Sequence, residues 1–180
     1  MKLKNILIFA GVFVVTIVVD QILKWQTYYV FRELIPNVLS VHFVRNFGAA
    51  FSWLEGMSGF LITVTILLTL AAGAFYFFKL HAKNHILMDL GFGFFIGGAV
   101  GNLIDRIFFG YVRDFIRLDF VNFPIFNMAD IFINIGVVLI VIYLVFIDKD
   151  KSFFKKAAIQ EGGATGTEEA KEAKDGKNND

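Results

Sequence analysis

The sequence predicts a mainly α-helical integral membrane protein: a bundle of four transmembrane helices with a small extracytoplasmic β-sheet and an interfacial loop or helix. The first reason is composition, since 57% of the 180 residues are hydrophobic, 18% are charged, and the mean hydropathy is +0.65. A soluble domain of this size could not bury so much apolar surface. The second reason is four separate apolar stretches, each close to the roughly 20 residues that cross the hydrocarbon core as a helix. The third is an alternating pattern between the first two stretches, which is typical of a strand.

The four expected spans cover about residues 5–24, 57–78, 86–106 and 129–148. The first could instead be a cleaved signal peptide, because Lys2 and Lys4 precede its apolar run. No small-residue cleavage site follows Val19, however, and a polar, charged sequence comes in its place. We therefore expect this helix to be retained.

Basic residues predict the topology, because cytoplasmic loops carry an excess of Lys and Arg. Lysines lie before the first span, in the link between the second and third, and after the fourth: Lys2, Lys4, Lys79, Lys83, Lys149, Lys151, Lys155 and Lys156. We expect a multi-pass membrane protein with both termini in the cytoplasm. Residues 1–156 would form the membrane domain, and residues 157–180, rich in Gly, Glu, Lys, Asn and Asp, a disordered cytoplasmic tail.

Both long outer loops, residues 25–56 and 106–130, contain patterned segments. In the first, Leu39, Val41 and Phe43 alternate with polar residues, which is the period of a half-buried strand, and a small sheet on the membrane surface would fit. The second is rich in aromatic residues mixed with charges. This composition predicts an interfacial segment, with a short surface helix as one option.

Polar residues recur at the outer ends of three spans and predict one shared wet pocket. Asp20 and Lys24 are four residues apart and share a helical face, so the structural explanation for them is an anchoring ion pair. Asn102, Asp105 and Arg106 close the third span, where an Asp105–Arg106 pair would also be structural. The same span carries small residues at a spacing that lets helices approach closely in lipid: Gly93, Gly97, Gly98, Ala99 and Gly101.

Two aspartates near the fourth span are candidate catalytic groups. Asp130 follows Asn127 where this span begins, so Asn127 could cap the helix and the helix dipole would favour an anion at Asp130. Asp114 lies in the second outer loop, where a solvated carboxylate paired with a nearby Arg is the simplest explanation. Carboxylates that enter hydrocarbon usually have a partner or a task, because their burial is costly. If the two meet, one pKa rises, and the pair can activate water and polarise a carbonyl.

Other chemistries lack the residues that they need. The absence of cysteine excludes disulfides, thiolate nucleophiles and thiolate metal ligands, and a net charge of +1 gives no indication of nucleic-acid binding. The three histidines do not form a His-Glu-x-x-His motif, and the four serines do not lie in a Gly-x-Ser-x-Gly motif. A carboxylate pair is what remains.

Five motifs then occur in order along the chain: Asp20-Gln21-x-x-Lys24, Asn46-Phe47-Gly48-Ala49-Ala50-Phe51, the run from Gly97 to Arg106, Val112-x-Asp114-Phe115, and Phe126-Asn127-x-Ala129-Asp130. Together they closely resemble the bacterial lipoprotein signal peptidases (signal peptidase II). The resemblance covers about residues 5–148 and includes the layout of four spans. It implies that the protein lies in the bacterial cytoplasmic membrane, with its active site near the outer face.

Members of this family are intramembrane aspartyl endopeptidases that remove signal peptides from prolipoproteins by cleaving before a diacylglyceryl-modified cysteine. The resemblance implies that Asp114 and Asp130 are the catalytic pair. It also implies a set of substrate-binding or supporting residues: Asp20, Lys24, Asn46, Gly98, Asn102, Asp105, Arg106, Asn127 and Ala129. The resemblance further implies that membrane lipid is a partner, that globomycin-type inhibitors bind at the same site, and that no metal or organic cofactor is needed.

The alternative function is a small proton-linked transporter or channel, because ionisable groups within spans also mark ion paths. Its polar residues should run across the membrane depth, whereas here they gather at the outer ends. The residues by themselves leave both classes open, and the resemblance favours the peptidase.

Overall fold

The computed structural model describes residues 3–48, 58–80 and 85–147. The predicted tail at residues 157–180 lies outside them, as do parts of the first outer loop and of the link between the second and third spans. The chain divides into two units, Met1–Tyr143 and Leu144–Asp180. The second unit contributes only the end of one helical segment to the described residues, so the fold is that of the first unit.

Four helices account for most of the described chain. They are α1 (Leu3–Gln26), α2 (Ser58–Phe75) with its π-helical continuation η2 (Tyr76–Leu80), α3 (Ile86–Phe109), and α4 (Met128–Ile142) with its continuation η4 (Tyr143–Ile147). All four are long and apolar enough to cross a membrane. Together with a three-stranded sheet they confirm the predicted fold class.

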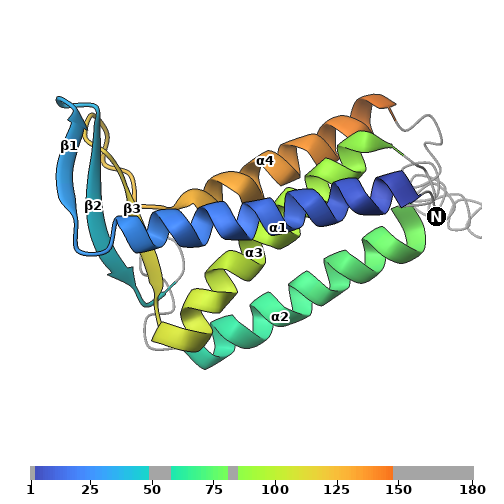
Figure 1. Ribbon diagram of the computed structural model, residues 1–180, viewed down its shortest axis with the longest axis horizontal. Helices are drawn as coiled ribbons and strands as arrows, with labels where there is room; N and C mark the ends of the chain where they lie inside the picture. The colour runs from blue at the N-terminus through green and yellow to red at the C-terminus, as the bar shows by residue number, and fades with distance from the viewer. Residues whose placement is uncertain (1–2, 49–57, 81–84, 148–180) are drawn as a thin grey trace, which may run out of the picture. The chain divides into compact units, whose positions relative to one another are not determined.

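Helix α3 is the centre of the bundle, and α1, α2 and α4 all pack against it (Figure 1). Small residues make this possible, as the sequence predicted. A Cβ atom added at Gly97 would lie 2.8 Å from the Cβ atom of Thr16 in α1, and one added at Gly98 would lie 2.5 Å from the carbonyl oxygen of Ala129 in α4. These helices therefore approach α3 more closely than any larger residue would allow.

The sheet lies at the end of the bundle where α1 ends and α4 begins (Figure 1). Its strands β1 (Phe31–Ile35), β2 (Leu39–Asn46) and β3 (Val112–Leu118) are antiparallel in the order β1-β2-β3. The predicted strand at Leu39 is confirmed, although the residue that it buries is Ser40, which donates to Asp119. The second outer segment forms β3 and a loop rather than a short surface helix, because β3 pairs its backbone with β2.

Candidate active site

Asp114 is held on a strand rather than in a solvated loop. It lies in β3 opposite Val44 of β2, and only 2% of its surface is exposed. The simplest explanation of this residue from sequence, a solvated loop carboxylate, is therefore wrong. Pairing with β2 fixes the backbone on both sides of Asp114, so the position of its carboxyl group is set by the sheet.

Asp130 lies in the first turn of α4, within a reciprocal cap. The side-chain oxygen of Asn127 accepts from the backbone N–H of Asp130 at 3.1 Å, and Asp130 Oδ2 accepts from the backbone N–H of Asn127 at 3.1 Å. The predicted cap at Asn127 is confirmed. Two helix-end donors are thereby satisfied, and the Asp130 carboxyl group is fixed at the positive end of the helix dipole.

A short backbone bridge brings the two aspartates together. Phe126, just before the cap, pairs with Ile116 of β3 through N–O distances of 3.1 and 2.8 Å. The chain therefore leaves β3, forms a loop, and returns to the same strand immediately before α4 starts. This return places Asp130 beside Asp114.

Three side-chain amides donate to the two carboxylates. Asn127 Nδ2 donates to Asp114 Oδ1 at 2.6 Å, and Asn46 Nδ2, from the end of β2, donates to Asp114 Oδ2 at 2.8 Å. Asn102 Nδ2, from α3, donates to Asp130 Oδ1 at 2.8 Å. All three asparagines were expected in the site, and each orients one or both acids.

A buried network of charges lies next to the amides. Lys24 contacts Asp20 at 2.9 Å, as predicted, and Asp105 at 3.4 Å, while Arg113 contacts Asp105 at 2.7 Å. The expected Asp105–Arg106 pair is replaced by these contacts, because consecutive helical residues point in different directions. The Arg106 side chain instead donates to the carbonyl oxygen of Gly48 at 3.2 Å.

The start of α4 is positioned by α1 and α3. Asp20 Oδ1 accepts from the backbone N–H of Ala129 at 2.9 Å, and Ala129, which is fully buried, packs against Gly98. Asp130 is the next residue. The position of Asp130 is therefore set by the contacts of three other residues: Asp20, Gly98 and Ala129.

Two residues of the network were missed as site residues. Arg113 reaches Gln21 at 2.7 Å in addition to Asp105, and Gln21 donates to the carbonyl oxygen of Gly101 at 3.1 Å. Both lie inside the quoted motifs, beside Asp114 and Asp20. Their position next to candidate acids was the available signal, and only the packing of three elements reveals their contacts.

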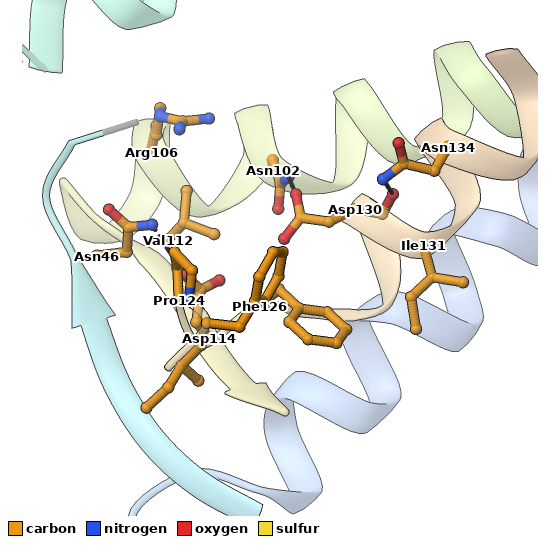
Figure 2. A pocket seen from close by; sticks show the side chains of 12 residues that line it. Asn46, Asn102, Arg106, Val112, Asp114, Pro124, Phe126, Asp130, Ile131 and Asn134 are labelled. Atoms are coloured by element: carbon orange, nitrogen blue, oxygen red, sulfur yellow. Dashed lines mark hydrogen bonds between the residues drawn. The ribbon is translucent and has the colours of Figure 1, made fainter. Parts of the chain in front are cut away.

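The two acids line one cavity of about 470 Å³. Figure 2 shows Asp114 reaching the cavity from β3 and Asp130 reaching it from α4, with Asn102 hydrogen-bonded to Asp130. One group of lining residues is polar and the other is apolar: Asn46, Asn102, Arg106, Asp114, Asp130 and Asn134, then Val112, Phe123, Pro124, Ile125, Phe126 and Ile131. The cavity therefore combines groups that can form hydrogen bonds with an apolar part of its lining.

The environment of Asp114 changes its acidity. Burial, and then the neighbouring charge of Asp130, raise the pKa of Asp114 from 3.8 to about 7, although the amide donors and Lys24 act in the opposite direction. Near neutral pH this carboxyl group can therefore be either a proton donor or an acceptor. Within residues 3–48, 58–80 and 85–147, no group of three or more His, Cys, Asp or Glu side chains could hold a metal ion.

Comparison with known proteins decides the family. The family model described as signal peptidase (SPase) II matches residues 12–146. The chain is 40% identical over 135 residues to the lipoprotein signal peptidase of Microcystis aeruginosa, covering 72% of this chain and 86% of that protein. It is 42% identical over 118 residues to that of Enterococcus faecalis, covering 66% and 72% respectively.

The chain belongs to the signal peptidase II family. Two solved bacterial membrane enzymes are similar in fold, each at 34% identity, with TM-scores of 0.70 and 0.67. The first alignment covers 82% of this chain and 91% of the other, and the second covers 80% and 94%. The resemblance is confirmed: this signal peptidase II is a protease and a multi-pass bacterial membrane protein, and the transporter alternative is not favoured.

Proposed function

We propose that this signal peptidase II cleaves prolipoproteins immediately before a diacylglyceryl-modified cysteine, with Asp114 and Asp130 as its catalytic pair. The observation that carries the proposal is that these two acids reach one cavity from β3 and α4 and are linked through the amide of Asn127. An acid pair in a partly desolvated site is the arrangement that aspartyl proteolysis requires.

The balance of charge supports one proton on the pair. The described site holds four aspartates and three cations: Asp20, Asp105, Asp114, Asp130, Lys24, Arg106 and Arg113. With one proton on Asp114 or Asp130 the total is neutral. The raised pKa of Asp114 favours such a proton at neutral pH.

The reaction follows from a pair that carries one proton. The ionised acid removes a proton from water, whose oxygen attacks the scissile carbonyl carbon, while the protonated acid gives its proton to the carbonyl oxygen. The first acid then protonates the leaving nitrogen, and the second recovers its proton as the C–N bond breaks. Asn46, Asn102 and Asn127 would hold the acids in place, and Arg106 would contact the substrate backbone.

The substrate would enter from the bilayer. Four consecutive residues of the cavity lining are apolar, which supports contact with the lipid part of the substrate: Phe123, Pro124, Ile125 and Phe126. The lysines that flank the spans support an orientation with both termini in the cytoplasm and the active site near the outer face. Globomycin-type cyclic peptides would inhibit by occupying the same cavity.

The test is cleavage of a diacylglyceryl-modified prolipoprotein by the purified protein. We expect Asp114→Asn and Asp130→Asn, made separately, each to lower kcat by roughly 10²–10⁴-fold, because each removes an acid–base group. Asp119→Asn is the matched control, since Asp119 follows the same strand but is exposed and pairs with Arg117 at 3.2 Å. Full activity of either site variant would remove that residue from the catalytic role.

A further inference from the structure

The three amides that donate to the acids must each keep one orientation. A side-chain amide has an acceptor oxygen on one side and a donor nitrogen on the other, so a flip would present an oxygen to a carboxylate. Asn46 is held because its Oδ1 atom accepts from the backbone N–H of Gly48 at 3.0 Å. Asn127 is held because its Oδ1 atom accepts from the backbone N–H of Asp130.

Asn102 differs from the other two in what holds it. Its Oδ1 atom accepts from Lys24 Nζ at 2.9 Å and from Asn127 Nδ2 at 3.0 Å, while its Nδ2 atom donates to Asp130. An ammonium group can only donate, so Lys24 requires the oxygen at this end of the amide, as the donor Asn127 Nδ2 also does. No backbone donor to this oxygen is recorded among the described residues.

Lys24 has an unusual position for a lysine. Its side chain is fully buried, and the ammonium has three acceptors within reach: Asp20 at 2.9 Å, Asn102 at 2.9 Å and Asp105 at 3.4 Å. Two of these contacts neutralise charge. The third reaches a neutral amide one hydrogen bond away from a proposed catalytic acid.

We infer that Lys24 is a positioning residue that, together with Asn127, fixes the orientation of the Asn102 amide and thereby keeps an N–H donor on Asp130. A flipped Asn102 would face Asp130 with its oxygen and Asn127 with its NH₂ group, so both contacts would join like groups. This inference rests on the proposed role of Asp130. It assigns to the Asp20-x-x-x-Lys24 pair a task beyond anchoring a helix end.

The experiment compares two neutral substitutions that differ in hydrogen bonding. Lys24→Met and Lys24→Gln both remove the charge and are similar to each other in length, but only the Gln side chain carries N–H groups that can donate to the oxygen of Asn102. We expect Lys24→Met to have a kcat roughly 10- to 100-fold below that of Lys24→Gln, since a hydrogen bond to a charged group is at stake, with similar KM and similar thermal stability. Equal kcat values in the two variants would overturn the inference.

Loss of the Lys24 charge leaves the buried carboxylates of Asp20 and Asp105 with less compensating positive charge, which could destabilise the fold by itself. The experiment therefore needs a pair of variants in which this charge is balanced. The same two substitutions are therefore also made with Asp20→Asn, which restores the charge balance and keeps an oxygen for the N–H of Ala129. The expected difference in kcat is the same. If the protein with Asp20→Asn and Lys24→Gln does not fold, a donor alone does not suffice, and the inference fails.

Two further measurements separate positioning from general stability. The double variant with Lys24→Met and Asn102→Leu should have a kcat only slightly below that of Asn102→Leu alone, because Lys24 acts through Asn102. If the double variant instead loses the product of the two single losses in kcat, Lys24 acts independently of Asn102. Asn5→Ala is the control at the opposite end of α1: it removes a buried bond to Asp89 of 2.7 Å and should lower thermal stability while leaving kcat unchanged. A loss of kcat in this control as large as in Lys24→Met would overturn the inference.

The inference can fail while the proposed function stands. One outcome would remove only the role of Lys24: Asp114→Asn and Asp130→Asn are inactive, while Lys24→Met and Lys24→Gln have equal kcat values. Active aspartate variants would instead remove the catalytic pair itself.

Discussion

Replacing Gly98 by alanine should disturb the active site from inside the bundle. The new Cβ atom would lie 2.5 Å from the carbonyl oxygen of Ala129 and 2.8 Å from Ile133 Cγ1, both in α4. Ordinary contacts begin at 3.4 Å, so α3 and the start of α4 must separate by about 0.9 Å. Because Asp130 follows Ala129, this shift moves a proposed catalytic carboxylate.

Two costs follow from that displacement. Overpacking a tight contact costs roughly 1–3 kcal/mol in the free energy of unfolding. A misplacement of about 1 Å costs about 10²-fold in rate. We therefore expect Gly98→Ala to lower the melting temperature in detergent and to reduce kcat for prolipoprotein cleavage by about 10²-fold.

Two glycines provide matched controls. Gly136→Ala places its Cβ atom 2.6 Å from the carbonyl oxygen of Gly91 in the same α3–α4 contact, but further along α4 from Asp130. It should destabilise as Gly98→Ala does and reduce kcat much less. Gly11→Ala, with nothing within 4 Å of the new atom, should change neither quantity. Wild-type kcat in Gly98→Ala, or equal kcat losses in Gly98→Ala and Gly136→Ala, would refute the positional argument.

Two other predictions concern protons and metals. Because the pair needs one proton and the pKa of Asp114 is about 7, kcat/KM should fall as pH rises above about 7, and an unchanged rate up to pH 9 would contradict this. The Asp114 carboxyl group binds its proton more tightly in the folded protein than in the unfolded chain, where its pKa is 3.8. Thermal stability should therefore fall as pH rises from about 4 to 7, and Asp114→Asn should weaken this dependence. EDTA should leave cleavage unchanged, whereas a strong loss would indicate a metal.

The membrane fold could be predicted from the sequence because each of its signals is local. Apolar length predicts a span, four-residue glycine spacing predicts close helix packing, and alternation predicts the strand at Leu39. The cap formed by Asn127 and Asp130 is also local, since its members are three residues apart. All of these depend on neighbours along the chain and on the surrounding solvent.

The contacts of the charged residues could not be predicted in the same way. Asp105 was expected beside Arg106, but it lies against Lys24, 81 positions earlier in the chain, and Arg113. Asp114 was expected in a solvated loop, but strand pairing buries it. Which charged groups a long side chain can contact depends on the distances between helices and strands, and these distances are set only when the elements pack.

The sequence by itself determined that this chain lies in a membrane, where its helices run, and which family its five motifs indicate. Composition and order suffice for these conclusions, because hydrocarbon selects apolar helices whatever their arrangement. Only the tertiary structure decided that Asp114 and Asp130 share a cavity, and that Lys24 reaches Asp130 through Asn102. These relations join β3, α4, α1 and α3, and they exist because the close approach at Gly98 and the return of Phe126 to β3 bring those elements together.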